Sequence, residues 1–264
     1  MTVRDAATVM LVRDEQDGLQ VFMLRRNLNS EFVGGAYVFP GGAVDDADRH
    51  SDLGAVCEGR SDAQASEALG IEEGGLAFWV AAIRECFEEA GVLLAYDEHG
   101  DMVRLSDATV AGRFQRHREA VDRGERRLVE ICADERLRIA VDHLHYFSHW
   151  ITPEGAPRRY DTRFFVCAAP PEQTALHDNR ETIANLWIRP ADALERYERG
   201  AFDLIFPTIK SLEAIGRFER SSDLLAAAAA AGDVPGLHPR LTSDGHGVRI
   251  HLPGDSEAAR GGGD

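Results

Sequence analysis

The sequence predicts an α/β protein, in which strands and helices alternate along the chain. Two apolar runs rich in β-forming residues, at 6–12 and 19–24, are separated by a short polar segment and predict a hairpin. A long amphipathic pattern at 76–90 predicts a helix. Strand patterns at 144–151 and 183–188 and helical patterns near the C-terminus follow. This succession of elements is typical of a layered α/β fold.

The segment between the hairpin and the helix is polar and rich in glycine. The second strand ends in Arg25 and Arg26, which in the simplest interpretation bridge acidic neighbours, and a loop leads from them to a short strand at 36–39. Pro-Gly-Gly follows at 40–42, and since glycine has no Cβ this backbone can approach a ligand closely. A plain turn is the alternative. For Asp48, a site role and a solvated position stay equally open.

The predicted helix at 76–90 has one apolar and one acidic face. Its apolar positions recur at intervals of three and four residues and form a stripe that predicts burial: Trp79, Ile83, Cys86, Phe87 and Ala90. Glu85, Glu88 and Glu89 fall on the opposite side. Carboxylates this close repel one another unless a cation lies among them, and oxygen ligands at a partly wet surface suit Mg²⁺ or Mn²⁺. A merely solvated glutamate face is the alternative. Gly91 predicts a left-handed cap.

The acidic face carries a motif. Residues 84–92 read Arg-Glu-Cys-Phe-Glu-Glu-Ala-Gly-Val, which resembles the second half of the signature of the Nudix hydrolases. The first half, Gly-x5-Glu, has its best match in Phe-Pro-Gly-Gly at 39–42, with Asp48 in the Glu position. The two halves are separated by an insertion. An interrupted box of this kind resembles the branch that includes peroxisomal coenzyme A diphosphatases.

This resemblance implies a fold, a reaction and a metal site. The fold is an α/β/α sandwich with a mixed sheet, to which helical insertions are added here. The reaction is hydrolysis of a nucleoside diphosphate linked to another moiety, a small-molecule substrate. Two or more divalent ions, Mg²⁺ or Mn²⁺, would be held by Glu85, Glu88 and Glu89, and a carbonyl of the glycine pair, that of Gly42, would join them.

The resemblance also assigns roles outside the carboxylates. Arg84 would orient Glu85 within the helix turn. In several Nudix enzymes an acidic residue a few positions before a Trp adds a metal ligand or serves as the base, and Glu181 stands six positions before Trp187. A loop carboxylate paired with Arg180 is the alternative for Glu181.

Coenzyme A or an acyl-coenzyme A is the substrate that the resemblance implies. Arg25, Gly35 and Phe39 follow the spacing of that branch, and so do Thr-Pro at 152–153 and the arginine-aromatic pattern at 159–165. Coenzyme A carries a 3′-phosphate that needs an extra cation, for which the candidates are Arg25, Arg26 and Arg163. Two alternatives stay open: a diphosphatase for ADP-ribose, a nucleotide sugar or a dinucleotide, and a non-catalytic nucleotide-binding sensor.

Two insertions interrupt the predicted domain. Residues 49–75 are polar, with a short helix predicted at 63–69, and form either a surface excursion or a lid. A short strand is predicted at 92–95. Residues 105–141 have helical periodicity with a break at Gly124, which predicts two helices. These helices either cap the core or form a second wall of a pocket.

The strand at 144–151 and the segment after it carry a set of charged and imidazole side chains. His143, His145 and His149 alternate and would point to one side of the sheet, but nothing else favours a zinc site. Alternation also places Asp161 and Arg163 on one face. Asp161 would either hold an Arg toward a phosphate or form part of a structural salt-bridge ladder.

Three helices, at 190–199, 207–217 and 221–231, follow the strand at 183–188. Residues 248–252 predict an edge strand, and the last dozen residues predict disorder. The domain expected from this pattern spans residues 1–220, with insertions at 49–75 and 105–141. Residues 221–264 would add a helix, the edge strand and a tail.

Charge and composition exclude several classes of function. With 45 acidic and 29 basic residues among 264, the net charge of −16 argues against a nucleic-acid partner. An acidic enzyme acting on a phosphate ester needs a metal to neutralise local charge. Four widely separated cysteines favour neither a zinc ribbon nor disulfides. Without an apolar run of about 20 residues or a signal-peptide core, we expect a cytoplasmic protein without a membrane partner. A homodimer is compatible with the sequence.

Overall fold

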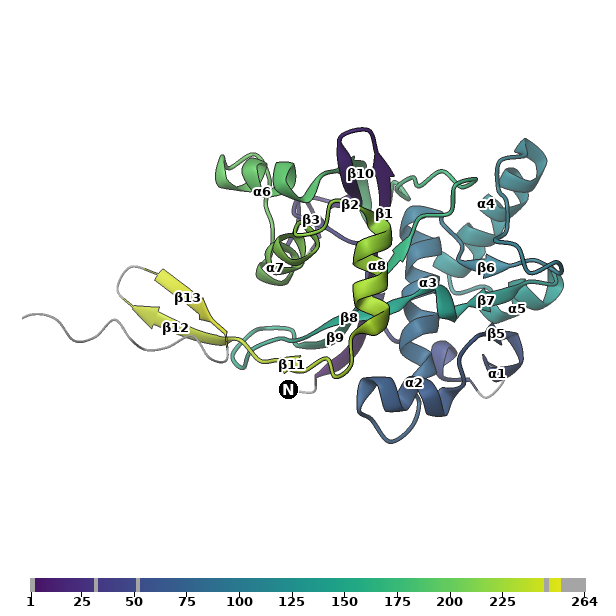
Figure 1. The fold of residues 1–264 in the computed structure, drawn as a ribbon, viewed down its shortest axis with the longest axis horizontal. Coiled ribbons are helices and arrows are strands. Elements are labelled where there is room, and N and C mark those ends of the chain that lie inside the picture. Colours follow the sequence, from purple (N-terminus) through teal and green to yellow (C-terminus); the bar gives the residue numbers. More distant parts are fainter. Residues whose placement is uncertain (1–2, 31–32, 51–52, 245–246, 253–264) are drawn as a thin grey trace, which may run out of the picture.

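The computed structural model describes residues 3–30, 33–50, 53–244 and 247–252 and has a mixed sheet at its centre (Figure 1). The spatial order of its strands is β10-β2-β1-β9-β8-β11, with β3 paired to β2 and β4 to β1. The strands are β1 (Arg4–Glu15), β2 (Gly18–Arg26), β3 (Tyr37–Val38), β4 (Gly41–Ala43), β8 (His145–Ile151), β9 (Tyr160–Ala168), β10 (Thr182–Ile188) and β11 (Gly236–Leu237). β1 runs antiparallel to β2 and parallel to β9, so the predicted hairpin and mixed sheet are confirmed.

Helices cover both faces of this sheet. One side carries α1 (Leu53–Val56), α2 (Asp62–Leu69), α3 (Leu76–Ala90), α4 (Ala108–Asp122) and α5 (Leu128–Asp134), and the other carries α6 (Pro190–Glu198), α7 (Phe206–Ile215) and α8 (Ser221–Ala230). Strand β1 shows the division, because Val9 and Leu11 pack toward α3 while Met10 and Val12 pack toward α7 and α8. The α/β/α sandwich is therefore confirmed. No described helix is long and apolar enough to cross a membrane.

A second, small sheet joins the two insertions. It consists of β5 (Cys57–Glu58), β7 (Arg138–Ala140) and β6 (Ala95–Tyr96), with β7 in the middle. The predicted helices α2, α4 and α5 are present, whereas β5 and β7 were not predicted. The prediction of a strand at 92–95 is wrong except at Ala95, where β6 begins. Leu93 is hydrogen-bonded through both its N–H and its carbonyl to the side chain of Gln173, which takes the place of a neighbouring strand.

The C-terminal segment continues beyond the sandwich. Helix α8 packs against β8 and β9, and β11 then occupies the edge of the main sheet beside β8. The edge strand predicted at 248–252 corresponds to β13 (Gly247–His251), which instead pairs with β12 (Arg240–Asp244) in a separate hairpin that projects from the body (Figure 1). The edge position is already taken by β11. The tail predicted to be disordered lies outside the described residues.

The prediction that three histidines share one face is wrong. A β-bulge between Tyr146 and Ser148 adds one residue to β8, so His145 and His149 point to opposite sides of the sheet. His143 lies in the 3-10 turn before the strand, and its ring nitrogen Nε2 contacts the carbonyl of Ala168. These rings therefore do not gather around a zinc ion.

Ile83→Ala should reduce the free energy of unfolding by about 2–5 kcal/mol, because the side chain is fully buried between α3 and the sheet. Urea denaturation followed by circular dichroism measures this loss. As a control, Tyr197→Ala on α6, where the ring is half exposed, should cost about 1 kcal/mol or less. An unchanged stability of the Ile83 variant would contradict the assignment of the buried face.

Candidate active site

Helix α3 is the element on which the candidate site is built. The predicted apolar stripe is buried. The indole Nε1 of Trp79 donates to the carbonyl of Leu144 at 3.1 Å, which anchors the helix to the residue directly before β8. Gly91 ends the helix in the left-handed region with φ of 68°, as predicted. The acidic side was expected to be partly wet, but it is largely covered by β4 and the turn that follows it. Glu89 is only 4% exposed.

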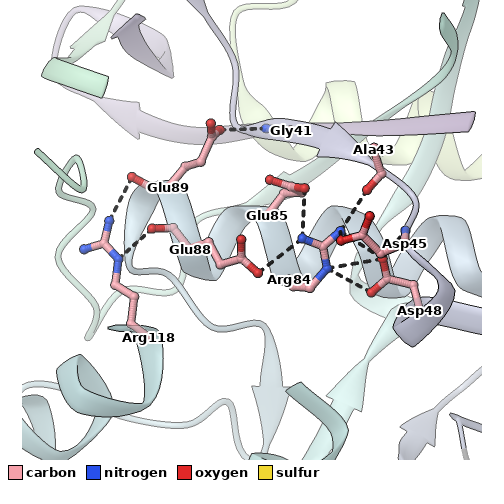
Figure 2. Close-up of polar contacts among 9 residues, drawn as sticks. All are labelled: Gly41, Ala43, Asp45, Asp48, Arg84, Glu85, Glu88, Glu89 and Arg118. Carbon is pink, nitrogen blue, oxygen red and sulfur yellow. Dashed lines mark hydrogen bonds and ion pairs between the residues drawn. The ribbon is translucent and has the colours of Figure 1, made fainter. Parts of the chain in front are cut away.

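Arg84 connects this helix to the strand above it. Its Nε and Nη2 donate to the two oxygens of Asp48, each at 2.9 Å, and Nη2 also donates to the carbonyl of Ala43 at 2.8 Å. On the other side Nη1 donates to Glu85 at 2.9 Å and Glu88 at 3.2 Å (Figure 2). Arg84 thus contacts Glu85 as predicted, but it holds Glu88 as well.

Asp48 is neither solvated nor grouped with the glutamates. It is 2% exposed, and its carboxylate is taken up by Arg84 and by the N–H of Asp45 at 2.9 Å. Asp48 and Arg84 are 36 residues apart in the chain but in direct contact in space. The insertion that separates them in the sequence leaves and returns between these two residues. The two halves of the interrupted motif are therefore joined in space by this ion pair.

The glycine pair lies directly on the acidic face and is not a plain turn. Gly41 and Gly42 belong to β4, which pairs with β1, and the N–H of Gly41 donates to Glu89 Oε2 at 2.9 Å (Figure 2). A Cβ on Gly42 would lie 2.4 Å from Glu85 Oε1, so glycine lets the strand approach the carboxylate in its present position. The backbone of Gly42 is therefore placed beside the carboxylates.

Burial makes the negative charge of these carboxylates costly. Burial raises the pKa of Glu85 to about 7, with repulsion from Glu88 adding to the effect and Arg84 opposing it. The pKa of Glu88 is also raised, chiefly by burial. Burial and repulsion from Glu85 hold the pKa of Glu89 well above its ordinary value, and the hydrogen bond from the N–H of Gly41 partly lowers it again. A cation among the three would relieve this cost.

The oxygen donors fit a hard divalent ion in their chemistry. Carboxylate oxygens are ligands that Mg²⁺ and Mn²⁺ prefer, and three of them lie on one face of α3 beside the backbone of Gly42. In the part of the chain that the structure describes, however, no three acidic, histidine or cysteine side chains converge as a ready-made metal site. Arg84 lies between Glu85 and Glu88, and Glu89 is turned to Gly41. Binding an ion therefore requires these carboxylates to rotate away from Arg84 and Gly41.

Glu181 is exposed directly before β10, within electrostatic reach of Glu89. Burial and the charge of Glu85 are the larger causes of the raised pKa of Glu89, and the negative charge of Glu181 adds to them. The backbone of Glu181 is fixed, because its N–H donates to Asp178 Oδ2 at 2.9 Å and its carbonyl accepts from the N–H of Asn27 at 2.8 Å. The side chain of Glu181 is thus exposed to solvent, while two hydrogen bonds hold its main chain.

The three candidate arginines differ in position. Arg25 is half-buried and donates to the carbonyl of Gly35 at 3.3 Å. Arg26 is also half-buried and lies close enough to Glu89 for its charge to oppose the rise in the pKa of that residue. The Nε of Arg26 is buried and has no hydrogen-bond partner among the described residues. Arg26 is therefore the candidate that the structure brings nearest to the carboxylates.

Arg163 does not join this group. It is 4% exposed, its guanidinium contacts Asp161 and His149, and it lies over the ring of Phe78 near the start of α3. The structural ladder is the interpretation that fits these contacts.

A cavity of about 210 Å³ adjoins the acidic face. Arg84 and Glu88 line one wall, the turn at 45–48 a second, and the connection between α4 and α5 at 121–129 a third. The larger cavity of about 670 Å³ shares no residue with the acidic face, since it lies at the β1–β2 turn and the start of α6. The 105–141 insertion thus lines this cavity, and it also packs Phe114 and Ile131 into the core, so both alternatives for this insertion apply.

Arg118 and Asp178 were not identified from the sequence. Arg118 is buried on α4 and binds the end of α3, and Asp178 holds the main chain of Glu181. A signal for Arg118 was present, because Phe114 and Val121 lie four residues before and three after it on the same helical face. A charged residue within such an apolar stripe indicates a buried partner.

The chain is similar to a known family and to known proteins. The family model described as the NUDT19 Nudix domain matches residues 60–215. Acyl-coenzyme A diphosphatase NUDT19 of Xenopus laevis is 29% identical over 78% of this chain, and the protein of the same name from Homo sapiens is 28% identical over 79%. The chain spans only 62% and 63% of those two relatives.

The fold has a counterpart among solved structures. A NUDIX hydrolase from Alicyclobacillus acidocaldarius superimposes with a TM-score of 0.71 over 89% of this chain and 99% of its own, at 24% identity. At this identity the likeness concerns the fold.

The metal-free protein should lose stability as the pH rises from about 4.5 to about 7. The pKa of Glu85 rises from its ordinary 4.5 to about 7 on folding. Between these values the folded state binds more protons than the unfolded state, so its stability falls with increasing pH. Glu85→Gln removes this titration, so the free energy of unfolding should fall less over this pH range, by on the order of 1 kcal/mol. Urea denaturation in EDTA at both pH values measures it, and parallel declines in the two proteins would contradict the assignment.

Proposed function

Because the chain belongs to the NUDT19 Nudix domain family, we propose that it is a diphosphatase that hydrolyses coenzyme A or an acyl-coenzyme A. The cleaved bond is the diphosphate, and the products are 3′,5′-ADP and a phosphopantetheine. The observation that carries the proposal is the group of three glutamates on one face of α3, faced by the backbone of Gly42. Glu85 and Glu88 are half-buried and bound to Arg84, and Glu89 is buried and bound to the N–H of Gly41. The names of the Xenopus and human relatives support the substrate.

In this proposal Glu85, Glu88, Glu89 and the carbonyl of Gly42 hold divalent ions, Mg²⁺ or Mn²⁺. When bound, such ions neutralise the diphosphate and lower the pKa of the attacking water. Arg84 is fixed by Asp48 and Ala43, and so it orients Glu85 and limits the directions in which Glu88 can turn. Glu181, exposed on a fixed main chain, accepts the proton of the water.

Arg26 is proposed to bind the substrate's anionic groups, with Arg25 beside it. Its buried Nε without a hydrogen-bond partner favours this role, because a phosphate would supply the acceptor. The contacts of Arg163 favour a structural role for that residue instead. The cavity of about 210 Å³ beside Glu88 offers room for a part of the substrate outside the diphosphate. A cytoplasmic location and a homodimer stay predictions.

Glu89→Gln should lower kcat by about 100-fold or more at saturating Mg²⁺ and leave the melting temperature unchanged or higher. The substitution removes a proposed ligand, and it also removes a buried carboxylate that is costly to ionise. Glu88→Gln should behave alike. Steady-state hydrolysis of coenzyme A, with phosphopantetheine detected, measures the effect. Glu119→Gln, an exposed residue of α4, is the matched control. Near-wild-type turnover in both site variants would refute the metal assignment.

The substrate assignment is tested on coenzyme A, dephospho-coenzyme A and ADP-ribose. Wild type should prefer coenzyme A, and Arg26→Ala should lower kcat/KM for coenzyme A by about 10–100-fold while affecting the two substrates without a 3′-phosphate less. Arg13→Ala at the far end of the hairpin serves as the control. Equal kcat/KM of wild type on all three would leave a broad nucleoside-diphosphate hydrolase. An equal loss on all three in the variant would place Arg26 at the diphosphate.

A further inference from the structure

We propose that Arg118, contributed by the helical insertion, is a positioning residue that holds the end of α3 and the loop of Glu181 in one fixed arrangement. Its catalytic consequence rests on the function proposed above. The residue lies on α4, is 7% exposed, and touches neither the side chains of the acidic face nor the cavity beside them. Its contacts are all with main-chain carbonyls (Figure 2).

Arg118 completes the hydrogen bonding of the last turn of α3. The final four carbonyls of a helix have no partner within it. Here the Phe87 carbonyl accepts from the N–H of Gly91 at 3.0 Å, and the Ala90 carbonyl accepts from the N–H of Leu176 at 2.9 Å. The two carbonyls between them belong to Glu88 and Glu89, and they accept from Arg118 Nε at 2.8 Å and Nη2 at 2.9 Å. The main chain of two proposed metal ligands is therefore held by one side chain.

The same guanidinium reaches the loop that carries Glu181. Nη2 of Arg118 also donates to the carbonyl of Leu176 at 3.0 Å. Two residues further on, Asp178 accepts from the N–H of Glu181 at 2.9 Å and from the N–H of Thr182 at 2.9 Å. Arg180 forms a second link to α4 through its ion pair with Asp122. The insertion thus fixes the distance between the carboxylate helix and the proposed base.

The geometry requires an arginine at this position. A guanidinium presents Nε and Nη donors in a rigid plane and can serve three carbonyls at once, whereas a lysine offers a single point charge. The positive charge also lies at the C-terminal, negative end of the helix dipole. Gly91 leaves room for it, since a Cβ there would stand 2.9 Å from Arg118 Nη1.

The experiment compares Arg118→Gln and Arg118→Lys with wild type, and with Arg116→Gln as the matched control on the exposed side of α4. Mn²⁺ binding to each folded, full-length protein is measured by the electron paramagnetic resonance of the free ion. Circular dichroism verifies folding at the same temperature. Hydrolysis of coenzyme A over a range of Mn²⁺ concentrations gives kcat, KM for the substrate and the Mn²⁺ activation constant.

We expect both Arg118 variants to bind Mn²⁺ about tenfold more weakly or worse, and to lose kcat with little change in KM for coenzyme A. Arg116→Gln should match wild type. Folded Arg118 variants with wild-type Mn²⁺ affinity and kcat would overturn the proposal. If Arg118→Gln does not fold, Arg118→Lys decides the question in the same way. Weaker Mn²⁺ binding combined with a wild type that cleaves no coenzyme A would refute the proposed function and leave the role of Arg118 intact.

Discussion

The buried ion pair between Arg84 and Asp48 is the interaction on which the site depends. Both side chains are almost inaccessible, and a buried charge is tolerated only where it is paired and hydrogen-bonded. Asp48 lies in the 3-10 turn after β4, and Arg84 lies in α3, so the pair joins the glycine strand to the carboxylate helix. Removing Arg84 would leave the buried carboxylate of Asp48 without a positive partner between these two elements. The remaining donors of Arg84 then reach Glu85 and Glu88, which places the carboxylates relative to the strand.

A second buried arginine repeats this principle at the end of the same helix. Arg84 fixes α3 from the side of β4, and Arg118 fixes its last turn from the side of the insertion. The two guanidiniums use different acceptors, because Arg84 binds mostly carboxylates and Arg118 binds only carbonyls. The carboxylates of Glu85, Glu88 and Glu89 lie on the stretch of helix between them. Such support from both sides explains how an acidic face can stay largely buried in a protein of net charge −16.

The sequence predicted the local elements well and the long-range contacts poorly. The apolar stripe of α3, the cap at Gly91 and the hairpin β1–β2 follow from periodicity and turn residues, which are local signals. The position of β13, the bulge in β8 and the replacement of a strand by Gln173 depend on partners distant in the chain. Local patterns do not contain this information.

The same distinction applies to the site. The shared face of the three glutamates and the contact of Arg84 with Glu85 were predictable, because these residues belong to one helix and one motif. The burial of Asp48 and of Arg163 could not be predicted, because it depends on contacts with β4 and with Phe78. Arg118 could be suspected only as a charge within an apolar stripe. Side chains that contact several elements at once are thus the ones that the sequence describes least well.

We propose that the acidic face of α3 binds divalent ions by releasing its carboxylates from Arg84. Crystals of the protein soaked in Mn²⁺ test it most directly, through anomalous diffraction at a wavelength where manganese scatters strongly. We predict anomalous peaks bounded by Glu85, Glu88, Glu89 and the carbonyl of Gly42, with Arg84 still bound to Asp48 and Ala43. Peaks elsewhere, or no peak while Arg84 stays bridged to Glu85 and Glu88, would contradict the account.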